Sequence, residues 1–178
     1  MRIIGGIFKG RRFVPPANNW PTRPTTDMSK ESLFNILNNR VDWEDMVMLD
    51  LFGGTGSHCY ECISRGCTDA TYVDNFAGCV SFVKSTAEAL KIEGQIKIYK
   101  SDVFKFLQTN IRQYDYIFAD PPYSLPKLAT LPDLIFQHNA LAPDGLFVLE
   151  HDKSHQFKQH SRFIEERKYG ATLMSFFG

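Results

Sequence analysis

The sequence predicts an α/β fold in which a doubly wound, mostly parallel sheet of seven strands ends in an antiparallel hairpin. From residue 47 onward, five short apolar runs alternate with stretches of helical character. This alternation indicates strand–helix–strand units, which place their strands parallel in one sheet. Two further β-rich runs surround Tyr169-Gly170 near the C-terminus, and a turn pair between such runs predicts a hairpin.

The chain begins with a predicted small ribbon. Residues 2–14 form brief strand-like runs interrupted by Gly5-Gly6 and Gly10. Basic side chains alternate there with Phe8 and Phe13, a mixture that suits RNA phosphates and unstacked bases. An edge ribbon whose charges only maintain solubility is the alternative. The candidate RNA-binding residues are Arg2, Lys9, Arg11, Arg12 and, beyond the ribbon, Arg23.

A helix is expected at about residues 28–39, with Asp27 as its N-cap and with Leu33, Phe34 and Leu37 on its apolar face. The formal net charge of the 178 residues is zero, but it is unevenly distributed. Residues 1–40 hold seven basic and two acidic side chains, whereas the rest hold 13 and 18, so the segments carry +5 and −5. This asymmetry predicts a polyanion-facing extension, residues 1–40, on an acidic domain, residues 41–178.

The sheet and its covering helices follow in order. Strands are expected at residues 47–52, 70–74, 96–99, 116–119 and 146–150, and the hairpin at 162–168 and 172–177. Helices are expected at residues 57–65 and near 129–138. A further helix follows the second strand and ends at about residue 90, and a short one begins at about residue 102. With 43% hydrophobic side chains, a chain of this length can bury one substantial core.

The tight loop Gly53-Gly54-Thr55-Gly56 follows the first strand and opens a helix, as in nucleotide-binding folds. Cys59 stands where a dinucleotide fold has its third glycine, and no G-K-[ST] follows, so neither pyrophosphate motif is present. The loop therefore suits a nucleoside-like ligand without phosphates. Taken alone this signal is weak, because any tight strand-to-helix turn uses glycine.

Acidic residues mark the ends of four successive strands: Asp50, Asp74, Asp102 and Asp120. The carboxyl ends of parallel strands share one edge of the sheet, where such folds bind ligands. Asp74 is placed to accept both hydroxyls of a ribose, and Asp102 to reach an adenine amino group, although Asp102 is also a good helix N-cap. The predicted cofactor-binding residues are Asp50, Phe52, Gly53, Gly54, Gly56, Asp74, Asn75, Asp102 and Val103.

The tetrapeptide Asp120-Pro121-Pro122-Tyr123 ends the fourth strand, and it resembles the signature of S-adenosylmethionine-dependent amino-group methyltransferases. Its parts can hold a planar amine. Asp120 and the Pro121 carbonyl accept hydrogen bonds from the amine, Pro122 fixes the backbone, and Tyr123 stacks on the base. All four are predicted catalytic residues.

The four cysteines bear on metal binding, and the N-terminal sequence bears on the location of the protein. Cys59 and Cys62 have C-x-x-C spacing, but Cys67 and Cys79 form no second pair, so buried apolar fillers are favoured over a zinc site. The N-terminus has no signal-peptide core, and no apolar run approaches the ~20 residues that span a bilayer. We therefore expect a cytoplasmic protein with no metal and no membrane contact.

Further motifs extend the resemblance over nearly the whole chain. These are Arg2-Ile3-Ile4-Gly5-Gly6, Lys9-Gly10-Arg11, Arg23-Pro24-Thr25-Thr26-Asp27, Leu49-Asp50-Leu51-Phe52, Asp120–Tyr123 and Tyr169-Gly170. Together they resemble the bacterial 16S ribosomal RNA guanine-N2-methyltransferase family. The resemblance implies a class I methyltransferase fold and methyl transfer from S-adenosylmethionine to one guanine amine. It also implies that ribosomal RNA or the assembling small ribosomal subunit is the partner.

Two departures from the family pattern and two alternatives remain at this point. Met28 stands where the family usually has a basic residue. His58 stands in a stretch where the family usually has smaller residues, and a structural role is favoured for it. One alternative keeps the reaction but uses a DNA adenine or a protein glutamine as acceptor. The other is a non-catalytic RNA-binding assembly factor.

Overall fold

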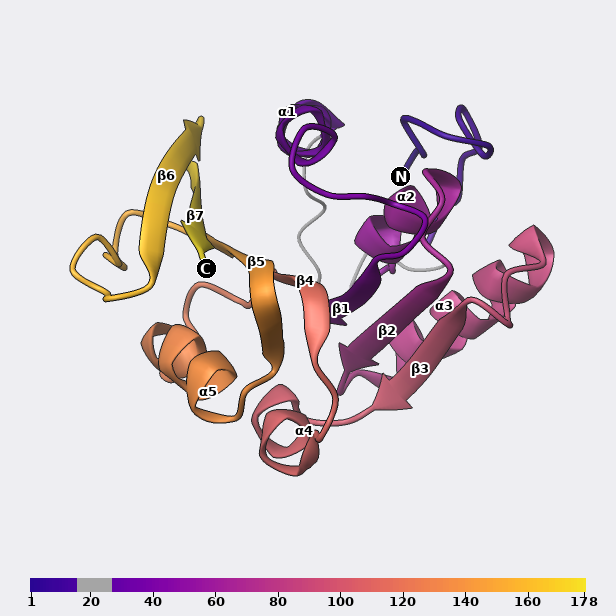
Figure 1. Cartoon of the computed structure of the whole chain (residues 1–178). Coiled ribbons are helices and arrows are strands. Elements are labelled where there is room, and N and C mark those ends of the chain that lie inside the picture. The colour runs from indigo at the N-terminus through magenta and orange to yellow at the C-terminus, as the bar shows by residue number, and fades with distance from the viewer. Residues whose placement is uncertain (16–26) are drawn as a thin grey trace.

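The computed structural model describes residues 1–15 and 27–178, and its centre is a seven-stranded sheet (Figure 1). The strand order is β3-β2-β1-β4-β5-β7-β6. The strands are β1 (Val47–Leu51), β2 (Asp69–Asp74), β3 (Ile96–Lys100), β4 (Tyr114–Ala119), β5 (Leu141–His151), β6 (Phe163–Tyr169) and β7 (Thr172–Phe177). The first five are parallel to one another, and β7 runs antiparallel to β5 and β6. The predicted fold class is confirmed.

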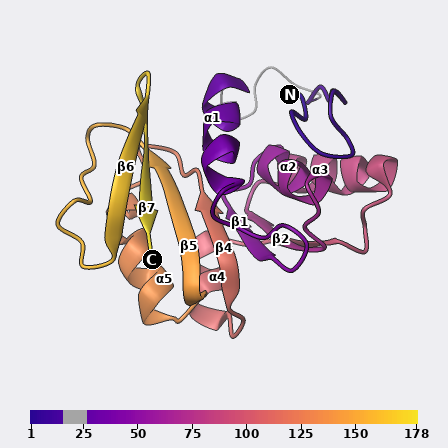
Figure 2. The same cartoon turned by 45° about the horizontal axis from the view of Figure 1, so that its top comes forward.

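Helices cover both faces of this sheet (Figures 1 and 2). They are α1 (Asp27–Leu37), α2 (Ser57–Ser64), α3 (Ala77–Leu90), α4 (Val103–Thr109) and α5 (Leu131–Gln137), the last preceded by a 3₁₀ turn, η1 (Leu128–Thr130). The first three pack on one face and the last two on the other. Alternation along β4 shows why: Tyr116 and Phe118 point to the α1–α3 side, and Ile117 and Ala119 to the α4–α5 side.

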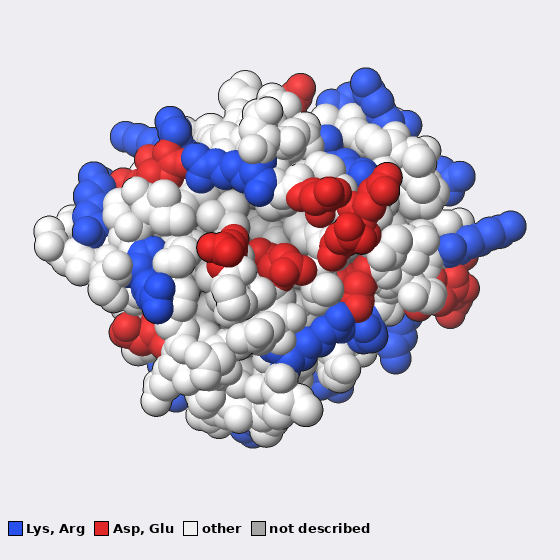
Figure 3. Space-filling model, viewed as in Figure 1, with Lys and Arg blue, Asp and Glu red and all other residues white. Residues whose placement is uncertain are grey.

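The N-terminal segment is a ribbon, as predicted. Arg2 and Arg12 form an antiparallel bridge, and the Ile3 amide donates to the Arg11 carbonyl at 3.0 Å. The cationic side chains of the ribbon are exposed. Figure 3 shows Lys and Arg along the upper edge of the molecule, on both sides of the place where α1 lies, with acidic side chains nearer the middle of that face.

A buried carboxylate attaches the ribbon to the body. Glu61 of α2 has no exposed surface, and its two oxygens accept the Ile4 amide at 2.9 Å and the Gly5 amide at 2.7 Å. Its charge is balanced by Arg65 at 3.0 Å and Lys30 at 3.6 Å. The ribbon, α1 and α2 therefore share one buried ionic centre.

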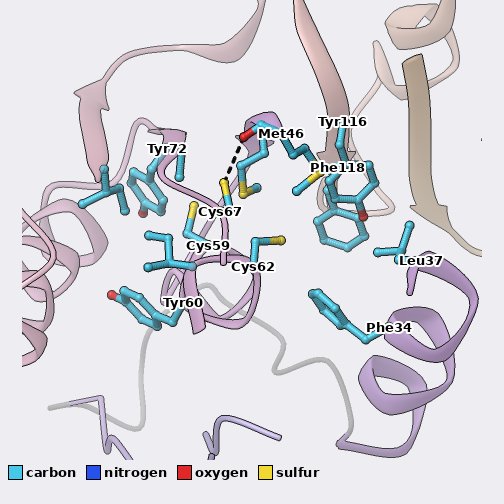
Figure 4. Close-up of a cluster of buried hydrophobic side chains, with 14 of the residues drawn as sticks. Phe34, Leu37, Met46, Cys59, Tyr60, Cys62, Cys67, Tyr72, Tyr116 and Phe118 are labelled. Atoms are coloured by element: carbon cyan, nitrogen blue, oxygen red, sulfur yellow. Dashed lines mark hydrogen bonds between the residues drawn. The ribbon is translucent and has the colours of Figure 1, made fainter. Parts of the chain in front are cut away.

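The core on the α1–α3 side contains three of the four cysteines together with large aromatic rings (Figure 4). Cys59, Cys62, Cys67 and Cys79 are all buried free thiols, and burial raises the pKa of each. The Cys67 thiol donates to the Met46 carbonyl at 3.3 Å. Their surroundings agree with the role of small apolar fillers.

Among residues 1–15 and 27–178, no helix is long and apolar enough to cross a bilayer.

Candidate active site

The strand order reverses between β1 and β4, since β2 and β3 lie on one side and β5 on the other. In open α/β sheets the crevice at such a switch point binds ligands. A cavity of about 530 Å³ lies there, at the carboxyl ends of β1, β2 and β4. Its lining residues are Met1, Lys30, Leu33, Asp50, Phe52, Gly53, Gly54, Thr55, Ser57, His58, Asp74, Asn75, Phe76, Cys79, Phe118, Asp120, Pro121, Pro122, Tyr123 and Ser124.

The glycine loop turns sharply because two of its glycines, and Phe52 just before it, have left-handed backbone. The φ angles of Phe52, Gly54 and Gly56 are 58°, 51° and 75°. At Gly53 a Cβ atom would lie 2.4 Å from the ring of Tyr72, so only glycine fits against that ring. The loop thereby passes close to β2 and leaves its cavity side open to a ligand.

Asp74 at the end of β2 organises the neighbouring loops. Its Oδ2 accepts the Gly54 amide at 2.9 Å, and its Oδ1 accepts the Phe76 amide at 2.8 Å. An ionised carboxylate has about four lone-pair positions, so each oxygen can accept one further hydrogen bond. The carboxylate is thus held in place and can still bind a pair of hydroxyls.

Asp50 lies deeper, with a side chain that is 1% exposed. Burial, opposed by a hydrogen bond from the Cys59 thiol and reinforced by the charge of Asp74, raises the pKa of Asp50 to about 7. The Cys59 Sγ lies 3.3 Å from Oδ2. Asp50 therefore changes charge near neutral pH and would be stabilised as an anion by a cationic ligand group.

The tetrapeptide Asp120–Tyr123 reaches the cavity directly from β4. The Asp120 amide donates to the Leu51 carbonyl at 3.3 Å, which fixes the start of the segment against β1. The Pro122 carbonyl accepts the Leu125 amide at 2.8 Å and closes the following turn. None of the hydrogen bonds among the described residues uses the Pro121 carbonyl. The start of the segment and the turn after it are therefore fixed at the cavity wall.

Tyr123 is oriented through its hydroxyl group. It donates to Glu150 Oε1 at 3.0 Å and lies 3.3 Å from Thr172 Oγ1. Burial is the main cause that raises the pKa of Tyr123, so the phenol stays neutral. The hydroxyl is tied to β5 and β7 while the residue lines the cavity, which restricts the positions that the ring can take.

Six of the nine predicted cofactor-binding residues line the cavity, as do all four of the predicted catalytic segment. Gly56, Asp102 and Val103 do not. Gly56 precedes α2, and Asp102 is the N-cap of α4, with its carboxylate accepting the Lys105 amide at 3.0 Å. The capping alternative for Asp102 is therefore confirmed, and contact with a ligand stays a prediction.

The four predicted RNA-binding residues that the structure describes are not part of the cavity lining. Arg2, Lys9, Arg11 and Arg12 are exposed on the ribbon, and Arg11 lies over the ring of Phe8 at 5.3 Å. Arg23 falls outside the described residues. The ribbon nevertheless reaches the cavity through its first residue, Met1, which forms part of the lining.

Sequence reasoning missed Lys30, which lines the cavity and is only 5% exposed. Its Nζ donates to the Arg2 carbonyl and to Ser57 Oγ, the latter at 3.1 Å. Lys30 precedes Leu33 by three residues and Phe34 by four, so helical periodicity would have placed it on the inward face. Counting it only as a positive charge concealed that position.

His58 also lines the cavity, and its contacts agree with the structural role that the sequence favoured. Its ring stacks on that of Phe118, with the ring centres 3.8 Å apart and the ring planes at 6° to each other. Its Nε2 lies 2.9 Å from the hydroxyl of Tyr116. Burial, together with the charge of Lys30, lowers the pKa of His58 well below its usual value, so the ring is neutral. It supports Phe118, which lies two residues before Asp120 on the same side of β4.

Comparison with known proteins adds a family and named relatives. The family model described as "Conserved hypothetical protein 95" matches residues 1–178. A Bacillus subtilis protein named "Putative rRNA methyltransferase YlbH" is 36% identical over 156 residues, 86% of this chain and 83% of that protein. The Escherichia coli K12 protein named "Ribosomal RNA small subunit methyltransferase D" is 32% identical over 151 residues, 84% of this chain and 74% of that protein.

The fold comparison agrees. A solved structure described as "Putative methyltransferase yhhF from Escherichia coli" superposes with a TM-score of 0.87 at 25% identity, covering 99% of this chain and 96% of that one. The similarity therefore includes the ribbon, the sheet and the C-terminal hairpin.

Proposed function

This chain belongs to the family described as conserved hypothetical protein 95, and on that basis we propose that it methylates ribosomal RNA. The methyl donor is S-adenosylmethionine, and the proposed acceptor is the exocyclic N2 of one guanine in 16S ribosomal RNA. One observation supports the proposal most strongly: Asp120–Tyr123 and the acids Asp50 and Asp74 line a single cavity.

The cavity fits the cofactor. Its volume of about 530 Å³ lies within the ~300–1,000 Å³ typical of small-molecule sites. Asp74 is fixed by two backbone amides and can accept the ribose hydroxyls. Phe52 and Phe76 line the cavity and would contact the adenine, and Asp50 would contact the cationic methionine portion. When bound, the cofactor supplies an electrophilic methyl group on a sulfonium sulfur.

The residues of the tetrapeptide would hold the amine for attack. Guanine N2 is a poor nucleophile because its lone pair is delocalised into the ring. Hydrogen bonds donated by the amine to Asp120 and to the Pro121 carbonyl would favour a geometry in which that lone pair is less conjugated. The Asp120 carboxylate would also stabilise the positive charge that develops on nitrogen.

Guanine suits these acceptors better than adenine does. N1–H and N2–H₂ of guanine are adjacent donors, whereas N1 of adenine is an acceptor that a carboxylate would repel. Stacking on Tyr123 would add ~1–3 kcal/mol to base capture. The base must leave its helical stack, or lie in an unpaired loop, to enter the cavity.

We further propose that the extension, residues 1–40, binds the phosphate backbone of the RNA beside this site. The net charge of these residues is +5 and that of the remaining residues is −5, and the cations Arg2, Lys9, Arg11 and Arg12 are exposed on the ribbon. Such a distribution favours a polyanion at the ribbon, and the substrate is either ribosomal RNA itself or the assembling small subunit.

The decisive experiment supplies labelled S-adenosylmethionine together with 16S ribosomal RNA, small ribosomal subunits, DNA or protein. We expect label in the RNA or the subunit, recovered as N2-methylguanosine after digestion to nucleosides. Label in adenine of DNA or in glutamine would instead establish one of the other acceptors. Cofactor binding with no transfer to any substrate would indicate an RNA-binding assembly factor.

A further inference from the structure

The β6–β7 hairpin carries the Tyr169-Gly170 motif, which the proposed reaction does not use. Tyr169 pairs with Thr172, so Gly170 and Ala171 form a two-residue turn. Gly170 has φ 61°, and a Cβ added to it would meet nothing within 4 Å. Glycine is therefore required there by the backbone conformation and not by crowding, and the turn projects into open space.

The end of this hairpin next to the turn contacts the active site. Thr172 Oγ1 lies 3.3 Å from the hydroxyl of Tyr123, whose side chain lines the cavity. Figures 1 and 2 both show α1 lying between this hairpin and the N-terminal ribbon. Lys30 and Leu33 of α1 and Met1 of the ribbon also line the cavity. The ribbon and the hairpin therefore flank the helix that borders the active site.

One face of β6 is directed towards α1. Register places Glu165 opposite Phe176 and Arg167 opposite Met174. Phe176 and Met174 are buried in the core cluster that includes α1, and Tyr169 packs on that cluster. Because alternate strand residues share a face, Glu165, Arg167 and Tyr169 lie on the α1 side.

A pair of arginines gathers on this face. The Glu165 carboxylate forms an ion pair with Arg40, which follows α1, and another with Arg167 at 2.6 Å. The Arg40 guanidinium also lies over the ring of Phe176, 5.5 Å from its centre. The two arginine side chains remain 35% and 51% exposed. One carboxylate cannot neutralise two guanidinium groups, and each keeps N–H donors for a further anion.

We propose that Arg40 and Arg167, held together by Glu165, form a second phosphate-binding site for the substrate RNA. This inference rests on the proposed function and deepens it, because it assigns the path of the RNA strand. A strand bound by the ribbon at one end and by this pair at the other crosses α1. The base between the two contacts is then delivered to the cavity beside Tyr123.

The test measures how RNA binding depends on salt. A fluorescent single-stranded RNA of ~20 nucleotides is titrated with the full chain and with Arg167→Ala from ~0.1 to ~1 M salt. One lost phosphate contact lowers the slope of log K against log salt by about 0.7 for a single strand. The dissociation constant of Arg167→Ala should therefore rise about five-fold at ~0.1 M salt and converge with that of the unaltered chain near ~1 M.

Matched variants separate phosphate binding from a structural ion pair. Lys158, in the loop before β6, pairs with Glu166, which lies on the other face of β6, so Lys158→Ala removes one cation paired with the same strand and should leave the slope unchanged. Glu165→Gln removes the shared anion and should keep or strengthen RNA binding. A purely structural ion pair predicts the reverse, with weaker stability for Glu165→Gln and no change in slope for Arg167→Ala.

Arg40→Ala is the second variant, and it should also lower the slope by about 0.7. If it does not fold, because its contact with Phe176 is lost, Arg167→Ala decides the question. An Arg167→Ala slope and affinity equal to those of the unaltered chain overturn the inference. This result is independent of whether the unaltered chain methylates 16S ribosomal RNA, which tests the proposed function separately.

Discussion

At the scale of single residues, neighbouring carboxylates acquire different properties from their surroundings. Asp74 is fixed by two backbone amides, Asp50 is buried beside a thiol, and Asp120 follows a strand at the cavity wall. We propose that the first accepts ribose hydroxyls, the second contacts a cationic group and the third holds the amine. These proposed roles follow from the surroundings of each acid, since the three side chains are the same.

Substitution of Asp120 tests whether the protein is an enzyme or only an RNA-binding protein. Replacing it by Ala removes the acceptor for the amine, and we expect kcat to fall ~10²–10³-fold, the loss typical of one preorganised electrostatic contact. Asp120→Asn should be milder, because an amide oxygen still accepts one hydrogen bond. Single-turnover methylation of RNA measures both, with calorimetry on the cofactor as a control that should change little. Methylation by Asp120→Ala at the unaltered rate would exclude the proposed role.

Asp50 should make the stability of the ligand-free chain depend on pH. Its pKa is raised to about 7 in the folded state, while an unfolded Asp titrates near ~3.9. Between these values the unfolded chain loses a proton that the folded chain retains, so stability falls as pH rises. Asp50→Asn should therefore be more stable than the unaltered chain at pH 8, by up to on the order of 4 kcal/mol, and similar to it near pH 4.

Urea unfolding from pH 4 to 8 measures this difference. Asp45→Asn is the matched control, since Asp45 is exposed and should show no such trend. A stability difference between Asp50→Asn and the unaltered chain that stays constant over the whole range would contradict the assignment.

At the scale of elements, the N-terminal ribbon depends on α2 for its position. Glu61 accepts hydrogen bonds from two ribbon amides and pairs with two cations within the core, although Ile4 and Gly5 lie more than fifty residues from it along the chain. An uncompensated buried charge or an unpaired buried amide is costly. The placement of the ribbon beside the cavity is therefore coupled to this one carboxylate.

Glu61→Gln should release the ribbon without unfolding the sheet. A neutral amide has one acceptor oxygen for two backbone donors and leaves Lys30 and Arg65 without their anion. We expect the Ile4 and Gly5 amides to exchange hydrogen much faster, while amides of β1 and β4 stay protected. Hydrogen-exchange mass spectrometry measures this, with Glu88→Gln on the exposed face of α3 as control. Unchanged protection of the ribbon would show that Glu61 does not hold it.

At the scale of the whole molecule, the charge is divided between an acidic body and a basic extension. Reversing Lys9, Arg11 and Arg12 to Glu should abolish RNA binding, because phosphate contacts dominate nucleic-acid affinity, and should leave cofactor affinity nearly unchanged. Filter binding and calorimetry measure the two affinities. Reversal of Lys84, Lys91 and Lys105, exposed on or beside α3 and α4, is the matched control. Equal RNA affinity for both triple variants would remove the ribbon from the RNA path.

The sequence alone predicted the order of strands and helices, the hairpin and the two loops that line the cavity, because these features depend on local patterns. Strand periodicity, glycine turns and acids at strand ends are visible over a few residues. The tertiary structure decided what local patterns cannot express. It brought Lys30, His58 and Met1 into the cavity lining, gathered Arg40 and Arg167 on one carboxylate, and buried Glu61 beneath the ribbon. These contacts join residues far apart in the chain, and only the packing of elements determines which side chains meet.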